Sequence, residues 1–483
     1  MKLTFYGGVR EIGGNKILLE DKNTAVFLDF GKSYHEASKY FEEFLNPRVV
    51  HGLKDYLALG LLPKKQGIYR EDLIYILQKQ REKEIKLFKK PSIDGSLLSH
   101  GHLDHAGYLS FLNPQILVYA SKETMAVLKA FSISRPKNLE NEILEISLRD
   151  VEDPRKRKKR KRKFKIVNNL ESFFIKNLEI IPLEIDHSLP GANMFLIKTS
   201  IGNVLYSGDF RLSELALKEK EKIYSFLKKS KIKIFLCEGT RVKEQSVLNE
   251  QAVYKKALQN VSKIKGLVVA DYSIGDVVRF KTLLKIAKKT NSLIALPYNY
   301  FNYLNVLNQE GVLKNKGIKQ KDFQNIVLYA KKKITFKKWE KDLLKNHKIC
   351  TAEDIRKNKS RFILVLNFYQ VQELIDIKPD RNSYYLRAIT EPHSEEMEIS
   401  EERFINWIEH FKMQGLKKDE ENPFKKVFER AHISGHISGK ELSEFINAIE
   451  PEMVIPIHTE FPEEFEKMHK RVKIVERNIP IDF

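Results

Sequence analysis

The sequence has few cysteines, no long apolar run and a deficit of acidic charge. Two cysteines, Cys237 and Cys350, cannot form a disulfide framework, so we expect a reducing compartment. No apolar run approaches the length of a membrane span, and the first residues lack the long apolar core of a signal peptide. We therefore expect a cytoplasmic protein that has no membrane partner.

The shortage of acidic residues leaves a strongly basic chain. Its 483 residues include 85 Lys and Arg against 64 Asp and Glu, which gives a formal net charge of +21. Hydrophobic residues make up 42% of the chain, an ordinary globular composition, and the length allows two or three domains. The positive charge favours a polyanionic partner, with nucleic acid ahead of an anionic membrane. Charge alone does not identify an enzyme.

The densest cluster of chemically active side chains is the segment 99–106, Ser-His-Gly-His-Leu-Asp-His-Ala. It holds three of the chain's 13 histidines and one aspartate, at His100, His102, Asp104 and His105. An apolar segment precedes it and glycines flank it, which fits a tight turn from a strand into a helix. Such a turn can aim these side chains at one point, where imidazole and carboxylate suit zinc, manganese or iron better than calcium. The segment therefore predicts a transition-metal site.

Two further candidate ligands follow later predicted strands. His187 comes just after one strand, and Asp209 comes just after the next. Taken alone, His187 is better explained as a hydrogen-bonded loop histidine. Asp29, at the end of an early strand, is as well explained as a turn former. An aspartate that lies between two clusters of ligands can also bridge two metal ions.

These motifs resemble those of a known family. H-x-H-x-D-H at 100–105 resembles the signature of the metallo-β-lactamase superfamily. Glu-Gly-Thr-Arg at 238–241 resembles the β-CASP branch of that superfamily, which acts on nucleic acids. The string Gly-Gly-Val-Arg-Glu-Ile-Gly-Gly-Asn at 7–15 and H-x-S-G-H at 432–436 resemble ribonuclease J-like proteins. The likeness follows the family order along nearly the whole chain.

The middle of the chain has a pattern of its own. A predicted strand at 266–270, a helix at 274–289 and a strand at 292–296 indicate a small parallel sheet with flanking helices. Together with the resemblance, this pattern predicts the α/β fold class, with a four-layer αββα metallo-β-lactamase domain and an inserted α/β β-CASP domain. The expected boundaries are 1–240 and 431–483 for the first domain and 241–430 for the inserted one.

The resemblance implies a metal site with two divalent ions, zinc or else manganese, each of which would keep a coordination position open. The ligands would be His100, His102 and His187 for one ion, Asp104, His105 and His458 for the other, and Asp209 between the two. Asp29 would support the ligands from behind. A histidine at position 458 follows the pattern of the RNA-processing members of the family.

The resemblance also supplies residues on the substrate side of the metals. His436 would stabilise negative charge or protonate the leaving oxygen, and Glu238 would fix the orientation of the His436 ring. Asp104 would also orient the attacking hydroxide. Further phosphate donors would be His432, Ser434 and the backbone N–H of Gly435.

Nine consecutive basic residues occupy 155–163. We expect this run to be exposed and mobile, because folding cannot neutralise so many adjacent charges. Three interpretations stay open: a nucleic-acid clamp, an inert solvated loop and, in a eukaryotic host, a nuclear import signal. The candidate RNA-binding residues are Arg155, Lys156, Arg157, Lys158, Lys159 and Arg160.

The segment 35–92 is longer than the resemblance leads us to expect. Its spacing predicts helices, including a charged, solvated helix over 70–90. Two roles stay open for it: covering the mouth of the active site, or elaborating one edge of the domain.

These features favour a metal-dependent ribonuclease, which hydrolyses RNA phosphodiester bonds with a water activated by two metals. The H-x-S-G-H string favours a 5′→3′ exonuclease, and endonuclease activity stays open. The alternatives are an endonuclease that acts only in RNA 3′-end processing, a small-molecule metallo-hydrolase on the same fold, and a binding protein with an inactive site. The middle domain and the basic charge argue against the second, and the complete ligand set argues against the third. We expect RNA as the partner and leave a homodimer open.

Overall fold

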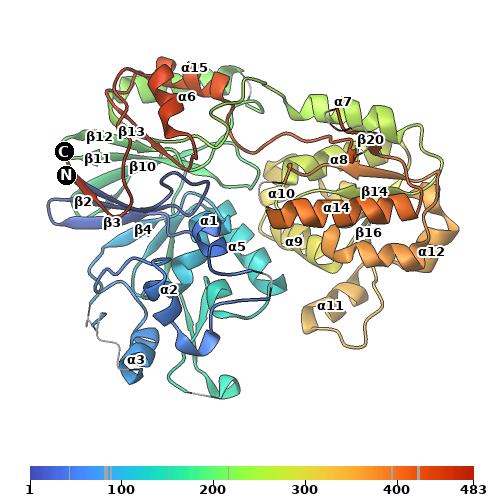
Figure 1. Ribbon diagram of the computed structural model, residues 1–483, viewed down its shortest axis with the longest axis horizontal. Helices are drawn as coiled ribbons and strands as arrows, with labels where there is room; N and C mark the ends of the chain where they lie inside the picture. The colour runs from blue at the N-terminus through green and yellow to red at the C-terminus, as the bar shows by residue number, and fades with distance from the viewer. Residues whose placement is uncertain are drawn as a thin grey trace. The chain divides into compact units, whose positions relative to one another are not determined.

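The computed structural model describes residues 1–42, 44–80, 85–86, 90–151, 153–215, 217–392, 395–420, 422 and 425–483. The chain folds into two compact units (Figure 1). The first unit comprises Met1–Val247 and Gly435–Phe483, and the second comprises Leu248–Ser434. Both ends of the chain therefore belong to one unit, in which the backbone N–H of Phe483 donates to the carbonyl of Met1 at 2.9 Å.

The first unit contains two large sheets, of seven strands in the order β23-β1-β2-β3-β4-β5-β8 and of six strands in the order β22-β13-β12-β11-β10-β9. The strands of the seven-stranded sheet are β1 (Lys2–Gly7), β2 (Lys16–Asp21), β3 (Thr24–Leu28), β4 (Gly95–Leu97), β5 (Val118–Ala120), β8 (Phe164–Ile166) and β23 (Pro480–Asp482). Those of the six-stranded sheet are β9 (Phe173–Ile175), β10 (Leu178–Glu184), β11 (Asn193–Thr199), β12 (Gly202–Tyr206), β13 (Ile232–Glu238) and β22 (Val454–Ile457). Each sheet is antiparallel at one end and parallel at the other.

The two sheets pack face to face because apolar residues alternate between the faces of their strands. In β2, Ile17 and Leu19 enter the core between the sheets, and Leu18 faces the opposite side. In β13, Ile234 enters the same central core and Phe235 faces away from it. This core joins strands from both ends of the chain.

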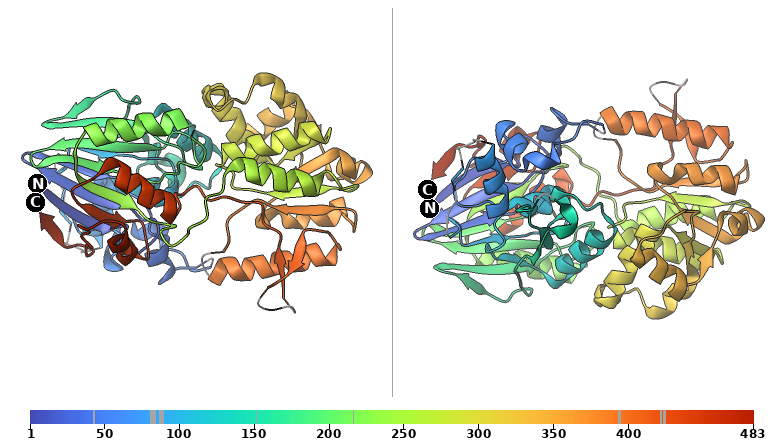
Figure 2. Two further views of the ribbon diagram at one scale, coloured as in Figure 1. Left: turned by 90° about the horizontal axis from the view of Figure 1, so that it is seen from above. Right: turned by 90° about the horizontal axis from the view of Figure 1, so that it is seen from below.

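Helices cover the outer face of each sheet, as the views from above and below show (Figure 2). The six-stranded sheet is covered by α6 (Leu217–Lys229) and α15 (Gly439–Ile449). The seven-stranded sheet is covered by α1 (Tyr34–Ser38), α2 (Lys54–Ala58), α3 (Glu71–Lys79), η2 (Gly107–Phe111) and α5 (Lys122–Ser134). Further short helices are α4 (Leu103–Ala106), η1 (Val49–His51), η3 (Leu139–Asn141), η4 (Pro154–Lys156) and η8 (Pro462–Lys467). The order of layers is helix, sheet, sheet, helix, which confirms the predicted αββα domain.

The segment 35–92 packs on the outer face of the seven-stranded sheet. Tyr56 of α2 and Leu73 of α3 are buried in the same core as Phe27 of β3. The predicted solvated helix over 70–90 is wrong, because α3 ends at Lys79 and buries one apolar face. Positions 81–84 and 87–89 lie outside the described residues.

The second unit is built on a six-stranded sheet in the order β17-β16-β15-β18-β14-β19, in which every pairing is parallel. Its strands are β14 (Val268–Asp271), β15 (Leu293–Leu296), β16 (Ile326–Tyr329), β17 (Ile349–Cys350), β18 (Phe362–Val365) and β19 (Tyr384–Arg387), with a separate hairpin of β20 (Leu416–Lys418) and β21 (Lys426–Phe428). Its helices are α7 (Glu250–Val261), α8 (Val277–Lys289), α9 (Tyr298–Gln309), α10 (Val312–Asn315), η5 (Gln320–Asn325), α11 (Lys338–Asn346), α12 (Ala352–Lys357), η6 (Lys359–Arg361), η7 (Phe368–Glu373), α13 (Leu374–Ile377) and α14 (Glu395–His410). The predicted parallel sheet with flanking helices is thus confirmed. No helix within the described ranges is long and apolar enough to cross a membrane.

Part of the basic run is folded, which corrects the expectation that all of it is exposed and mobile. Residues Lys159–Lys161 form β7, which pairs with β6 (Glu145–Ser147). Arg162 is 5% exposed, and its guanidinium donates to the backbone carbonyls of Leu109 and Leu112 at 2.6 and 2.8 Å. Burial lowers the pKa of Arg162 to about 9. The expectation failed because backbone carbonyls can take the place of water around a guanidinium. Among the other basic residues of the run, one is half-buried and seven are exposed.

Candidate metal centre

The histidine-rich segment lies at a turn from a strand into a helix, as its sequence predicts. Residues 98–102 connect β4 to α4. Gly101 is needed in this turn, because a Cβ there would lie 2.9 Å from the side chain of Val127. The turn buries His100 and His105 fully and brings both beside Asp209, which follows β12.

The first group of ligand-type side chains consists of His100, His102, His187 and Asp209. Nε2 of His100 and Nε2 of His187 lie 2.9 and 3.1 Å from Nδ1 of His102. Oδ2 of Asp209 lies 3.7 Å from Nε2 of His100 and 3.9 Å from Nε2 of His187. His187 follows β10, so the group joins the ends of three strands.

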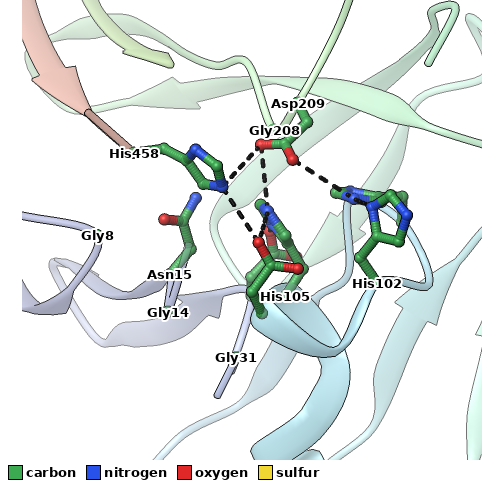
Figure 3. Close-up of polar contacts among 12 residues, drawn as sticks. Gly8, Gly14, Asn15, Gly31, His102, His105, Gly208, Asp209 and His458 are labelled. Atoms are coloured by element: carbon green, nitrogen blue, oxygen red, sulfur yellow. Dashed lines mark hydrogen bonds and ion pairs between the residues drawn. The ribbon is translucent and has the colours of Figure 1, made fainter. Parts of the chain in front are cut away.

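The second group consists of Asp104, His105, Asp209 and His458. Nε2 of His105 lies 3.1 Å from Oδ1 of Asp209, and Nε2 of His458 lies 3.4 Å from the same oxygen. His458, which follows β22, also lies 3.3 Å from Oδ2 of Asp104. Asp209 has His458 and His105 on one side and His102 on the other (Figure 3). It therefore offers one carboxylate oxygen to each group.

The residues of both groups fit a bound metal ion. Within each group the candidate ligand atoms lie within 4.8 Å of one another. Nε2 of His105 and Oδ1 of Asp209 are buried without a hydrogen-bond partner among the described residues, although they lie 3.1 Å apart. Buried polar atoms without a partner are rare because they are costly, and a cation between these two would satisfy both. Imidazole nitrogen and carboxylate oxygen are ligands that zinc and manganese accept.

The electrostatics of the first group favour the protonation states that bind a metal. Burial lowers the pKa of His100 and His187 well below the usual value, and lowers that of His102 to about 4. Burial alone would raise the pKa of Asp209, but the neighbouring histidines, His105 first, hold it well below its usual value. Neutral imidazole and ionised carboxylate are the forms that coordinate metal ions.

Asp29 lies behind the ligands, fully buried at the end of β3. Its carboxylate lies 2.6 Å from Nδ1 of His105 and accepts hydrogen bonds from the backbone N–H of Ser99 at 2.7 Å and the Tyr206 hydroxyl at 2.5 Å. With Nδ1–H of His105 donated to Asp29, Nε2 is left to face Asp209. This is the way a second carboxylate commonly orients a metal-binding histidine.

The half-buried His436 pairs with the fully buried Glu238 beside the second group. Nδ1 of His436 lies 3.0 Å from Oε2 of Glu238 and 3.8 Å from Oδ2 of Asp209. Burial lowers the pKa of His436, but the carboxylates of Glu238 and Asp209 outweigh burial and raise it to about 9. Glu238 is itself fixed by the backbone N–H of Phe210, which donates at 2.8 Å. The same pair, with Asp209 and His458, has the spacing of a third ligand group.

The amino-acid sequence of this site is similar to that of known metallo-hydrolases. Residues 426–475 match the family model described as the Zn-dependent metallo-hydrolase RNA specificity domain. Ribonuclease J of Pyrococcus abyssi is 23% identical, over 95% of this chain and 90% of that protein. Ribonuclease J of Methanocaldococcus jannaschii is 20% identical, over 95% and 92%, and that of Mycoplasma pneumoniae is 20% identical, over 100% and 71%. The predicted resemblance is thus confirmed, and the chain is ribonuclease J-like.

The fold of this ribonuclease J-like chain has a counterpart among solved structures. A protein of unknown function from Enterococcus faecalis has a TM-score of 0.71 and 19% identity, over 99% of both chains. With the family model, this likeness confirms a metallo-β-lactamase fold that carries an extra domain. The predicted membership in the β-CASP branch of the superfamily is likewise confirmed.

The glycine-rich string at 7–15 supports the metal centre of the ribonuclease J-like chain through its backbone (Figure 3). Gly13 has a φ of +81°, and a Cβ there would lie 2.6 Å from Oδ2 of Asp104. The N–H of Asn15 donates to the carbonyl of Asp104 at 3.0 Å, and the N–H of His458 donates to the carbonyl of Gly8 at 2.8 Å. The string therefore positions both Asp104 and His458, which are 354 positions apart in the sequence.

Thr240 holds His458 in the ribonuclease J-like site, and this role was not predicted. The Thr240 hydroxyl lies 2.9 Å from Nδ1 of His458 and donates to Glu238 at 2.9 Å. The Nδ1–H of His458 is thus directed to Thr240, and its Nε2 faces the carboxylates. A signal was present, because Thr240 stands in the Glu-Gly-Thr-Arg string, but only Glu238 was assigned a role there.

Other predicted residues of the ribonuclease J-like chain lie outside the ligand groups. His432 and Ser434 belong to the second unit, where Nδ1 of His432 lies 3.3 Å from Nη1 of Arg279. Gly435 belongs to the first unit and accepts the Nδ1–H of His187 at 2.8 Å through its carbonyl, a contact that was not predicted. The basic candidates at 155–160 lie in the segment that connects β6 to β7 and in β7 itself, and they form no part of the three groups.

Proposed function

We propose that this ribonuclease J-like protein is a metal-dependent ribonuclease that hydrolyses phosphodiester bonds in RNA. The observation that carries the proposal is the His436–Glu238 pair, which lies 3.8 Å from the carboxylate shared by both ligand groups. His436 stands inside the stretch that matches an RNA specificity domain, and the net charge of +21 suits a polyanionic substrate. A hydrolase of small neutral molecules would need neither feature.

The proposed metal site uses the seven ligand-type side chains of the first two groups. Two ions, zinc or manganese, would lower the pKa of a water and neutralise charge on the phosphate when bound. Asp29 and Thr240 hold the rings of His105 and His458 so that both Nε2 atoms face the site. The Asp104 side chain is 21% exposed, so it can also orient a water that enters from the solvent side.

The proposed acid is His436. Its Nδ1–H is directed to Glu238, which leaves Nε2 to hold a proton next to the leaving oxygen. Its side chain is 19% exposed, so a substrate can reach it. Glu238 fixes the ring and stabilises the protonated form. His432, Ser434 and the N–H of Gly435 stay proposed phosphate donors, and we propose that the second unit is the β-CASP domain.

We infer that the cleavage mode is 5′→3′ exonucleolytic, because the H-x-S-G-H string resembles ribonuclease J-like enzymes. Time-resolved digestion of 5′-labelled and 3′-labelled RNA carrying monophosphate, triphosphate or hydroxyl 5′ ends tests this. An exonuclease releases the 5′ label as a mononucleotide from the first time points, at a rate that depends on the 5′ end. Internal fragments from both labels, independent of the 5′ end, would support endonuclease action alone. Absence of RNA cleavage with zinc or manganese, combined with hydrolysis of thioesters or lactones, would overturn the ribonuclease proposal.

We also propose that the basic hairpin, which comprises β6, β7 and the run 155–163, tethers RNA by phosphate contacts. Seven of its nine basic side chains are exposed, and Arg162 anchors it to the backbone of 109–113. An anchored row of cations can follow a phosphate backbone without reading its sequence. The alternatives are an inert loop and an import signal, and the salt dependence of RNA binding separates the inert loop from the tether.

A further inference from the structure

A hollow of about 390 Å³ lies on the second unit, and none of its lining residues belongs to the ligand-type groups. It is lined by Phe368, Tyr369 and Gln372 of η7 and by Arg403, Asn406 and Trp407 of α14. Its volume falls within the range of roughly 300–1,000 Å³ that small-ligand sites occupy. Neither the family model nor the proposed chemistry assigns it a role.

The walls of this hollow are fixed by buried contacts. η7 is anchored by Val371, which is 4% exposed, and by Glu373, which accepts a hydrogen bond from the Tyr329 hydroxyl at 2.7 Å. On α14, Arg403 and Trp407 are four residues apart and so share one face of the helix. The adjoining face of α14 buries Phe404. The hollow is therefore preformed by rigid elements.

The side chains that line the hollow combine flat aromatic surface with unused polar groups. Tyr369 is 81% exposed, and its ring centroid lies 5.6 Å from that of Phe368. The side chains of Arg403, Asn406 and Gln372 make no hydrogen bond or ion pair within the described part of the chain. Aromatic faces stack on nucleobases, amides bond to base edges, and guanidinium groups bind phosphate.

We propose that this hollow binds one nucleotide of single-stranded RNA, with its base stacked on Tyr369 and Trp407. Arg403 contacts the phosphate, and the amides of Gln372 and Asn406 bond to the base edge. The inference rests on the proposed function in taking RNA as the substrate, and it adds a binding subsite at which no bond is broken. A single cation among the lining residues suits one phosphate and gives too little charge for a lipid surface.

The chain offers a direct fluorescence reporter, because it has only two tryptophans, Trp339 and Trp407. In a Trp339→Phe variant with its metals, Trp407 is the single emitter. We expect a non-cleavable phosphorothioate RNA of about six nucleotides to quench it to saturation. The same backbone without bases should leave the emission unchanged, because stacking and not charge causes the quenching. A Trp407→Phe variant, which keeps Trp339, should show no quenching.

Removing the exposed aromatic ring should weaken binding of the same RNA. We expect Tyr369→Ala to raise the dissociation constant roughly 5- to 150-fold, the range that base–aromatic stacking supports. Tyr75→Ala is the matched control, since Tyr75 is a 51% exposed tyrosine of the first unit. Thermal melting of both variants checks that each is folded.

Unchanged Trp407 emission at saturating RNA, with equal affinity in Tyr369→Ala, would overturn the subsite. Emission that responds to protein concentration alone, with a dimer in sedimentation, would assign the surface to a protein interface and also overturn it. Cleavage assays keep the two proposals apart. RNA cleavage with unchanged Trp407 emission refutes only the proposed subsite. Quenching of Trp407 without any RNA cleavage refutes only the proposed nuclease activity.

Discussion

Two clusters of like residues in the first unit behave in opposite ways. The segment 99–106 turns its histidines inward, and His100 and His105 are fully buried beside Asp209. The basic run 155–163 turns most of its side chains outward, and only Arg162 enters the interior. Neutral imidazoles and carboxylates attract one another and can share a buried space, whereas adjacent cations repel and stay in water. A dense cluster therefore predicts convergence only when its members can form hydrogen bonds with one another or bind the same ion.

The buried cluster should lose both metal binding and activity when the carboxylate that its two ligand groups share is removed. Asp209→Ala takes one oxygen from each ligand group, so we expect metal content to fall and RNA cleavage to drop on the order of 10⁴-fold or more. Elemental analysis and single-turnover cleavage measure this. Asp150→Ala, which removes an exposed aspartate of the same unit, is the control and should change neither. Two metal equivalents retained in Asp209→Ala would contradict the assignment.

The neighbour of the buried cluster, His436, should matter for chemistry and not for metal binding. We expect His436→Ala to lower cleavage roughly 10²–10⁴-fold at unchanged metal content, because it removes the acid. Glu238→Gln should lower cleavage less, since it keeps a hydrogen bond to Nδ1 of His436. Loss of metal in His436→Ala would instead make His436 a ligand, as the spacing of the third group also allows.

Within the basic run, the one buried member should matter most for stability. Arg162→Met removes the guanidinium that donates to the buried carbonyls of Leu112 and Ile143. An unsatisfied buried group costs roughly 1–3 kcal/mol, so we expect the free energy of unfolding to fall by about 3 kcal/mol. Lys163→Met removes the same charge from an exposed neighbour and should change stability by less than about 0.5 kcal/mol. Equal denaturation midpoints would show that Arg162 is no anchor.

The exposed members of the run should produce the smallest effect, and it should depend on salt. Lys158→Gln, Arg160→Gln and Lys161→Gln together remove three exposed charges and keep β7 compatible with its pairing. On single strands each phosphate contact contributes roughly −0.7 to the log–log salt slope, so the slope should fall in magnitude by about 2. Turnover of a short, saturating RNA should stay unchanged.

The control for the salt experiment removes the same charge elsewhere. Lys218→Gln, Lys222→Gln and Lys229→Gln neutralise exposed lysines of α6. This variant should keep the wild-type slope for an RNA of about 30 nucleotides. Parallel slopes for the hairpin variant, the control and the wild type would refute the tether and support the inert interpretation.

Local patterns in the sequence predicted most of the elements that position the site. Apolar residues alternate along β2 and β13, so each strand has two apolar faces. One face packs between the sheets, and the other packs against the covering helices. The strand–helix–strand spacing predicted the parallel sheet of the second unit. The surface that the segment 35–92 covers was not predicted, because apolar spacing along a helix does not say which sheet the helix packs against.

By itself the sequence determined which residues could bind metal, because His-x-His-x-Asp-His is a local turn whose side chains must point together. Only the tertiary structure decided which atoms meet. Asp104 and His458 are 354 positions apart and lie 3.3 Å from each other. Asp29 reaches His105, Thr240 reaches His458, and Arg162 finds its carbonyl acceptors for the same reason. These contacts form between strands and turns that packing brings together. The spacing of residues within one segment does not determine the distance between two segments.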